Sequence, residues 1–270
     1  MDSALFEKII SEIQHEDIRV FVLYHGGEPF LNKNIFEYIK LLRSFHPDAF
    51  IKIVSNGMLF DDELISDICA SSLNQIEFSM DGLSPSENSS IRRGSDSSKT
   101  IQVVNKLIQC ISGTGSMLKV AISTTQFFDD MLDGKSPLDN KATAPEWLMS
   151  SFDGVEEFKA TWAMAWPRMM IEDEFKIVEF DDESMTSLYI DSCDHLSNTI
   201  TIRANGDVVP CCYDLMSDLA MGNLLESTIK EIWGSPKYNH LRQQITTMQP
   251  SQTCSNCNVI RKMKRFLIKK

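Results

Sequence analysis

The chain reads Ile18-Arg19-Val20-Phe21-Val22-Leu23-Tyr24 and continues directly into His25-Gly26-Gly27-Glu28-Pro29. The first stretch is a short apolar run rich in β-branched and aromatic residues, which is typical of a buried strand. The second stretch is a polar, glycine-rich turn at the point where that strand ends. A strand that ends in a turn and leads into a helix is the repeating unit of a parallel sheet.

The same alternation of strand and helix continues downstream. Further strands are predicted at residues 50–54, 76–80, 118–123 and 158–163, and helices at residues 5–13, 35–42, 61–71 and 99–111. Repeated βα units fold into a parallel sheet with helices packed against it. The predicted fold class is therefore α/β.

Three of the predicted strands end in polar motifs. These motifs are His25-Gly26-Gly27-Glu28-Pro29, Ser55-Asn56-Gly57 and Ser79-Met80-Asp81-Gly82. Each motif alone predicts only a turn, because glycine and asparagine supply the positive φ that a chain reversal needs. Parallel sheets bind ligands at the carboxyl ends of their strands. Three motifs in phase therefore predict a ligand site, in which Gly26 and Gly27 admit close backbone approach and Glu28 accepts hydrogen bonds from an ammonium group.

Four of the seven cysteines stand in the last third of the chain, at Cys193, Cys211, Cys254 and Cys257. One C-x2-C pair and two isolated cysteines can close the coordination shell of zinc or of an iron–sulfur cluster. An odd number of cysteines in a reducing compartment favours metal binding over structural disulfides. Zinc sites more often show two such pairs, so a cluster is favoured and zinc stays open.

A predicted hairpin presents the second of these cysteines. Thr199-Ile200-Thr201-Ile202-Arg203 alternates with period two, Asn205-Gly206 is a strong hairpin turn, and Val208-Val209 restarts a strand that leads to Cys211. Successive strand residues point to opposite faces. We therefore expect Cys211, and not Cys212, to face the metal.

The rest of the C-terminal part is predicted to be mainly helical. A helical pattern runs from residue 227 to residue 249, and Gly234-Ser235-Pro236 is expected to split it into two helices. The basic segment 261–270 is expected to be a solvated tail or a closing helix. A more specific hypothesis is that this segment packs near the metal site, whose thiolates carry negative charge.

Composition limits the possible partners. The chain has 270 residues, 43% of them apolar, and a net charge of −12. The acidic balance argues against general affinity for nucleic acid or anionic membranes, and no apolar run reaches the ~20 residues that span a bilayer. We expect a cytoplasmic protein whose partners are small molecules or peptides.

These motifs resemble the radical S-adenosylmethionine (SAM) family, in particular its members with a C-terminal auxiliary-cluster domain of the SPASM or twitch type. Gly26-Gly27-Glu28-Pro29 is similar to the G-G-E-P motif of that family, Ser55-Asn56-Gly57 to its T-N-G motif, and Ser79-Met80-Asp81-Gly82 to its S-x-D-G motif. The resemblance implies that SAM is bound by Gly26, Gly27, Glu28, Ser55, Asn56 and Ser79, with Arg92 or Arg93 pairing with its carboxylate.

The tail resembles the auxiliary-cluster domain. The resemblance implies a [4Fe-4S] auxiliary cluster on Cys193, Cys211, Cys254 and Cys257. It also implies a partial radical SAM (βα) barrel over residues 1–170, without the first barrel strand. A small SPASM or twitch domain with a β-hairpin and helices is then expected over residues 171–270.

The chain departs from the family in one respect. The family places a C-x3-C-x2-C loop after its first barrel strand to hold the cluster that cleaves SAM, and no cysteine precedes Gly26 here. The chain is expected to be either a fragment, which we favour, or a degenerate relative. A complete protein would use a 5′-deoxyadenosyl radical and a cytoplasmic one-electron reductant to oxidise or modify a cyclitol, a sugar or a peptide. The alternative is a non-catalytic iron–sulfur or zinc protein that binds a peptide or a partner.

Overall fold

The computed structural model describes residues 1–129, 136–169, 171–180 and 187–270, which form two compact units. We call Ile13–Gln126 together with Lys141–Thr161 the sheet unit, and Met1–Glu12, Phe127–Asn140 and Trp162–Lys270 the cysteine unit. The cysteine unit thus combines the first residues of the chain with its C-terminal part.

The sheet unit is an α/β structure, which confirms the predicted fold class. Its five-stranded sheet has the order β1-β2-β3-β4-β6, and the pairs β1–β2, β2–β3 and β3–β4 are parallel. The strands are β1 Val20–Val22, β2 Phe50–Ser55, β3 Gln75–Ser79, β4 Lys119–Gln126 and β6 Glu157–Trp162. The helices are η1 Pro29–Leu31, α2 Ile35–Phe45, α3 Asp62–Ala70, α4 Pro85–Ile91, α5 Ser97–Thr114 and α6 Glu146–Met149. Every predicted strand is present.

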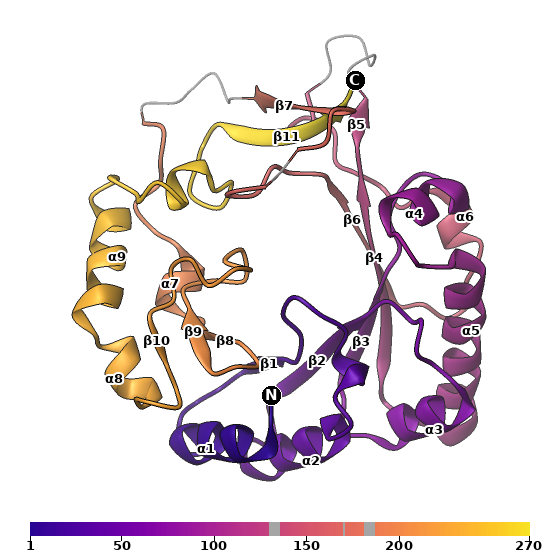
Figure 1. Cartoon of the computed structure of the whole chain (residues 1–270). Coiled ribbons are helices and arrows are strands. Elements are labelled where there is room, and N and C mark those ends of the chain that lie inside the picture. Colours follow the sequence, from indigo (N-terminus) through magenta and orange to yellow (C-terminus); the bar gives the residue numbers. More distant parts are fainter. Residues whose placement is uncertain (130–135, 170, 181–186) are drawn as a thin grey trace. The chain divides into compact units, whose positions relative to one another are not determined.

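One face of this sheet is packed against helices. Figure 1 shows α2, α3 and α5 lined up along the same side of the sheet. Ile53 of β2, Ile76 and Phe78 of β3, and Val104 and Leu107 of α5 are fully buried. Burying apolar side chains of this size contributes roughly 1.5–3 kcal/mol each. The core that results holds the carboxyl ends of the strands in fixed positions.

The opposite face of the sheet carries a buried ion cluster. Lys52 Nζ lies 2.7 Å and Lys159 Nζ 2.8 Å from the same oxygen, Glu77 Oε2. Burial by itself would raise the pKa of Glu77, but hydrogen bonds from Lys159 and Lys52 outweigh burial and hold this pKa below its ordinary value. The carboxylate therefore stays ionised and ties β2, β3 and β6 together.

The cysteine unit contains two small sheets and several helices. The sheets have the orders β5-β11-β7 and β10-β9-β8. Their strands are β5 Phe128–Asp129, β7 Phe175–Phe180, β8 Thr201–Ile202, β9 Asp207–Val209, β10 Gly222–Asn223 and β11 Lys264–Lys269. The helices are α1 Ser3–Ile13, α7 Asp194–Ser197, α8 Ile229–Trp233, α9 Pro236–Thr246 and η2 Cys254–Asn256.

Two local predictions for this unit are confirmed. The hairpin is present, because β8 and β9 pair antiparallel with Thr201 opposite Val209, and Gly206 in its turn has a φ of 90°. The long helical pattern is divided, because α8 ends before Gly234 and α9 begins at Pro236.

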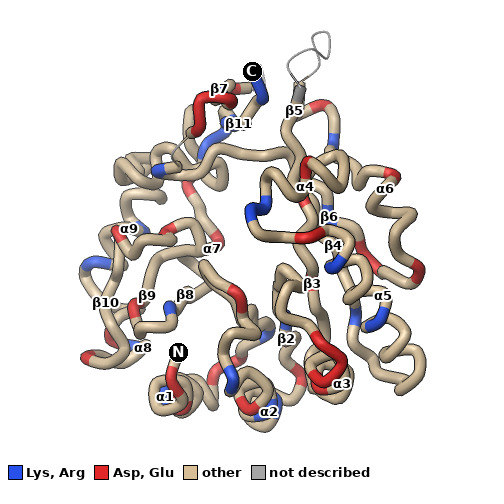
Figure 2. The backbone as a smooth tube through the Cα atoms, turned by 45° about the vertical axis from the view of Figure 1, so that its right-hand side comes forward, with Lys and Arg blue, Asp and Glu red and all other residues tan. Residues whose placement is uncertain are grey.

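The prediction that the basic C-terminal segment is a tail or a closing helix is wrong. Residues 264–269 form β11, which pairs antiparallel with β7 and parallel with β5. Phe266, Leu267 and Ile268 are buried in this central strand. The partner β7 lies far away in the sequence, and short-range patterns do not reveal such a pairing. Figure 2 shows basic residues on β11 close to acidic residues on β7.

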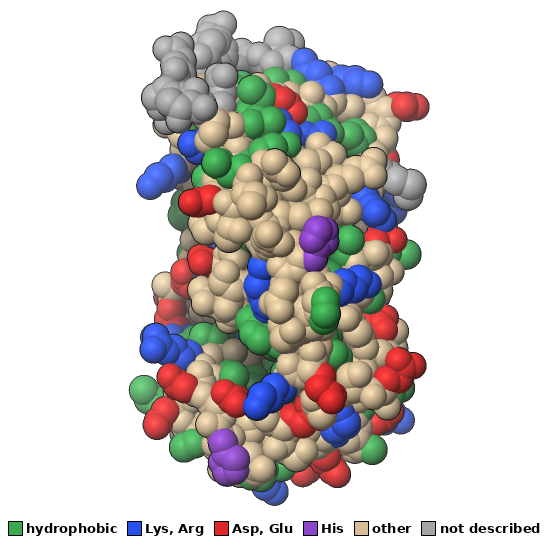
Figure 3. Space-filling view, turned by 90° about the vertical axis from the view of Figure 1, so that its left-hand side faces the viewer, with side chains coloured by type: hydrophobic (Ala, Val, Ile, Leu, Met, Phe, Trp, Pro, Cys, Tyr) green, Lys and Arg blue, Asp and Glu red, His purple; other side chains and the backbone are tan. Residues whose placement is uncertain are grey.

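The surface has mixed charge. On the face that carries α9, acidic and basic side chains are interspersed (Figure 3). Among the residues that the structure describes, no helix has the length and apolar character that crossing a bilayer requires.

The ion cluster of the sheet unit gives a stability prediction. Glu77→Gln should lower the free energy of unfolding at pH 7 by about 3 kcal/mol, because it leaves two partly buried lysines without their carboxylate. A carboxyl whose folded pKa is depressed stabilises the fold above its unfolded pKa and loses that contribution as pH falls through the folded pKa. The difference from the wild type should therefore shrink below about pH 4.5, the ordinary value for Glu77.

Urea unfolding monitored at several pH values measures this difference. Glu157→Gln is the matched control, because the Glu157 carboxylate forms its ion pair with Lys159 at 3.2 Å and is half exposed. This control should cost less than about 1 kcal/mol. Equal losses in the two variants would show that the buried cluster contributes nothing specific.

Candidate functional site

The four C-terminal cysteines line one pocket in the cysteine unit. Cys193, Cys211, Cys254 and Cys257 share this pocket with mainly apolar residues. The apolar residues are Pro167, Leu196, Pro210, Leu219, Ile245, Val259 and Ile260. The structure therefore brings together all four residues that the sequence marked as metal ligands, although their role as ligands stays a prediction.

Short local structures present each cysteine. Cys193 is the N-cap residue of α7, and its carbonyl accepts a hydrogen bond from Leu196 N at 3.0 Å. Cys211 stands two residues after the end of β9, and its carbonyl accepts from Asp214 N at 3.2 Å. Cys254 and Cys257 belong to one tight turn, in which Cys257 N donates to Cys254 O at 2.9 Å.

Burial disfavours ionisation of three of these thiols, those of Cys211, Cys254 and Cys257. It raises the pKa of the Cys211 thiol to about 12, and it also raises the pKa values of Cys254 and Cys257 above their ordinary value. The thiolate is the form that binds a metal. Deprotonation in this apolar pocket therefore needs the compensating positive charge of bound metal, which couples metal binding to proton release.

The donor set fits an iron–sulfur cluster by its chemistry. Four soft thiolates in an apolar pocket are the ligand type of clusters held by four cysteines. Among the described residues, no three His, Cys, Asp or Glu side chains stand in a preformed group that could hold a metal ion. Cys212 is exposed and does not line the pocket.

Four further polar residues of the pocket, His195, Tyr213, Asp214 and Thr253, lay outside the predicted site. Tyr213 and Asp214 line the pocket beside the cysteines. Asp214 is only 5% exposed, and its carboxylate accepts hydrogen bonds from the backbone N–H groups of Asp218 and Leu219, each at 2.9 Å. This carboxylate holds the turn after Cys211 in place. The only feature of the sequence that pointed to Asp214 was its position three residues after Cys211.

The sheet unit has a separate open cavity of about 400 Å³. This volume lies in the range of small-molecule sites. The cavity is lined by Asn56, Met58, Asp81, Ile91, Arg92, Arg93, Gly94 and Ser95. Three of these residues, Asn56, Arg92 and Arg93, were predicted to bind SAM. Figure 2 shows basic residues in the loop after α4.

Glu28 connects the first two polar motifs. Its Oε1 accepts a hydrogen bond from Ser55 Oγ at 2.8 Å, and its Oε2 accepts one from Asn56 N at 2.9 Å. Glu28 and Ser55 do not line the cavity, but they fix the turn that places Asn56 there. Their predicted contact with SAM stays a prediction.

The third motif contributes Asp81. Its Oδ2 forms a 2.8 Å ion pair with Arg92 Nε, and its Oδ1 accepts from Thr125 N at 2.7 Å. Asp81 was part of the S-x-D-G motif but not of the predicted site.

Three predicted SAM-binding residues do not line the cavity: Gly26, Gly27 and Ser79. A Cβ added to Gly27 would meet no atom within 4 Å, so space for a ligand exists beside its backbone.

Two family profiles match the chain. The profile of the radical SAM superfamily matches residues 1–121, and the profile of the SPASM iron–sulfur cluster-binding domain matches residues 193–258. The second match contains all four pocket cysteines.

A known enzyme and two solved structures are similar to the chain. An S-adenosyl-L-methionine-dependent 2-deoxy-scyllo-inosamine dehydrogenase from Niallia circulans is 33% identical over 69 residues, which are 25% of this chain and only 28% of that enzyme. Streptococcus suis SuiB bound to S-adenosylmethionine has a TM-score of 0.58 at 14% identity, over 96% of this chain and 66% of SuiB. BtrN in complex with AdoMet and 2-DOIA has a TM-score of 0.52 at 16% identity, over 96% of this chain and 80% of BtrN. At such identities the structures show a shared fold.

The carboxylate of Glu28 gives a prediction for the cavity. Glu28→Gln should speed hydrogen exchange over residues 55–57 on the order of tenfold, because the Gln amide keeps only one acceptor oxygen for the two bonds that Ser55 Oγ and Asn56 N donate to the carboxylate. Hydrogen exchange read by mass spectrometry measures the effect. Glu16→Gln changes an exposed residue of the same type and should leave exchange in this turn unchanged. Unaltered exchange in Glu28→Gln would contradict the role of Glu28 as a support of Asn56.

Proposed function

Because the chain belongs to the radical SAM superfamily and carries a SPASM iron–sulfur domain, we propose that it provides the SAM-binding and auxiliary-cluster functions of a radical SAM oxidoreductase. The substrate class that we favour is a small cyclitol or sugar. The proposed setting is the cytoplasm, where a one-electron reductant is available and cysteines stay reduced.

The four-cysteine pocket is the observation that carries the proposal. Cys193, Cys211, Cys254 and Cys257 would hold a [4Fe-4S] auxiliary cluster, and such a cluster is a one-electron redox centre. The buried Asp214 holds the turn after Cys211, and mainly apolar residues surround the cysteines. The apolar surroundings and the positions of the ligands both tune a redox centre.

The cavity of the sheet unit supports SAM binding. SAM supplies a 5′-deoxyadenosyl radical in this family when a reduced cluster cleaves it. The guanidinium groups of Arg92 and Arg93 are donors suited to a carboxylate, and the Asn56 side chain adds a neutral polar contact. The Asp81 carboxylate holds Arg92 at the cavity wall.

The substrate class rests on the sequence relative. The dehydrogenase from Niallia circulans acts, by its name, on an aminocyclitol, and we propose a related hydroxyl oxidation for the complete protein. Peptide modification is the second candidate, because SuiB, which has been solved with its precursor peptide SuiA, has a similar fold. Binding assays with aminocyclitols and with peptides would separate these two candidates.

Iron analysis tests the auxiliary-cluster function. Anaerobically reconstituted chain should contain about four irons and four sulfides, and Cys193→Ala and Cys254→Ala should each lose most of them. Cys212→Ala is the matched control and should keep the full iron content, because this cysteine lies outside the pocket. A single zinc in place of iron, or equal loss in all three variants, would overturn the proposal.

SAM binding tests the other half of the function. The sequence contains no C-x3-C-x2-C motif, so this chain by itself should bind SAM without releasing 5′-deoxyadenosine. Arg92→Ala should weaken binding roughly tenfold, about 1.4 kcal/mol, in isothermal titration calorimetry. Lys106→Ala, which removes an exposed cation on α5, should leave the affinity unchanged. If the wild type shows no heat of SAM binding, this half of the proposal fails.

A further inference from the structure

Three basic residues contact the backbone of the turn that holds Cys254 and Cys257. Arg261 Nη1 donates to Ser255 O at 3.1 Å, Arg265 Nη1 to Asn256 O at 3.4 Å, and Lys264 Nζ to Asn258 O at 2.6 Å. We call Arg261, Lys264 and Arg265 the basic collar. It comes from β11 and the residues just before it.

The basic collar carries excess positive charge. Glu179 of β7 pairs with Arg261 at 3.1 Å and with Arg265 at 3.4 Å. No carboxylate of the described residues forms an ion pair with Lys264, whose Nζ is held by the backbone oxygens of Asn258 and Arg261. Three cations against one carboxylate give these four side chains a net charge of +2, while Asp214 adds one negative charge to the pocket itself.

Part of this charge is shielded from solvent. Arg261 is only 7% exposed, and solvent screens buried charges weakly. Lys264 Nζ contacts the carbonyl of Asn258, the residue that follows Cys257, so its ammonium lies beside the turn that carries this cysteine.

A four-cysteine cluster becomes more negative when it accepts an electron. Nearby positive charge stabilises the reduced form more than the oxidised form and so raises the reduction potential. The basic collar also donates hydrogen bonds to backbone carbonyls of the turn. These bonds fix the positions of Cys254 and Cys257 relative to the positive charges of the collar.

We propose that Lys264, with Arg261 and Arg265, raises the reduction potential of the auxiliary cluster and thereby makes it a better electron acceptor. This inference rests on the proposed function, since it requires the cluster. Lys264 acts as a positioning and electrostatic residue that does not itself bind iron.

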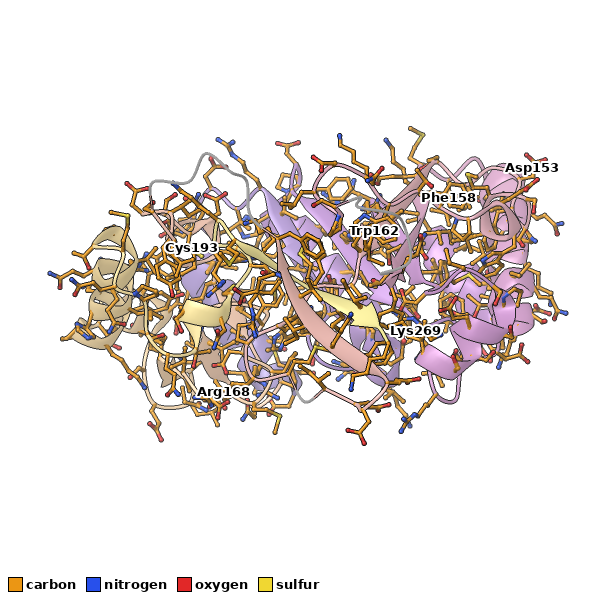
Figure 4. The ribbon with its side chains drawn as sticks, turned by 90° about the horizontal axis from the view of Figure 1, so that it is seen from above. Asp153, Phe158, Trp162, Arg168, Cys193 and Lys269 are labelled. Carbon is orange, nitrogen blue, oxygen red and sulfur yellow. The ribbon has the colours of Figure 1, made fainter. Side chains whose placement is uncertain are left out.

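The test is a spectroelectrochemical redox titration of the reconstituted full chain. Lys264→Met should lower the reduction potential by an amount equal to roughly a tenfold change in the one-electron equilibrium, about 59 mV. Lys264→Arg keeps the charge and should stay near the wild type. Lys269→Met removes a cation from the other end of β11, and Figure 4 shows Lys269 well away from Cys193, so the potential should not change.

Each outcome bears on the proposal. Equal potentials in Lys264→Met and Lys269→Met, with four irons bound in both, would overturn the role of the collar while leaving the proposed function intact. If Lys264→Met does not retain iron, Lys264→Arg becomes the test. Iron bound by Lys264→Arg supports a requirement for positive charge at this position, and loss of iron from Lys264→Arg overturns the proposal. Arg265→Met should shift the potential in the same direction as Lys264→Met. Wild-type chain that binds no iron would instead refute the proposed function itself.

Discussion

The ionisation of four thiols in an apolar pocket is the constraint on which the C-terminal part of this protein depends. Burial raises the pKa of Cys211 to about 12, so an empty pocket favours neutral thiols. Bound metal supplies the positive charge that reverses this preference. Hydrogen bonds fix the turns around the pocket: Asp214 holds the turn after Cys211, and basic residues hold the turn of Cys254 and Cys257. The local fold therefore holds the four cysteines around one mainly apolar pocket, where we propose that they bind the cluster.

The sheet unit uses polar side chains to fix its strand ends. Glu28 bonds to the turn after β2, and Asp81 bonds both to β4 and to Arg92. These carboxylates position other residues, so that Asn56 and Arg92 reach the cavity. On the face of the sheet opposite the helices, the buried Glu77 pairs with Lys52 of β2 and Lys159 of β6 and so joins three strands. Rigid strands with polar ends are what a parallel sheet needs to bind a charged ligand.

Much of this arrangement was predictable from sequence because it is local. The alternation of strands and helices, the Asn205-Gly206 hairpin and the break before Pro236 each depend on neighbouring residues, and the structure confirms them. The grouping of the four cysteines followed from ligand chemistry and spacing.

What escaped prediction depends on contacts between distant parts of the chain. The pairing of β11 with β7 joins residues more than eighty positions apart, and this pairing turns an expected tail into a central strand. The ion pair of Asp81 with Arg92 and the contacts of the basic collar likewise appear only once the chain is folded. Spacing alone could not show that Asp81 supports a predicted ligand-binding arginine.

Native mass spectrometry of the anaerobically reconstituted chain tests the central claim most directly. The account predicts one dominant species whose added mass equals one four-iron, four-sulfide unit, with protons lost from the cysteine thiols. A species that carries a single zinc ion, or apoprotein alone after reconstitution, would contradict it.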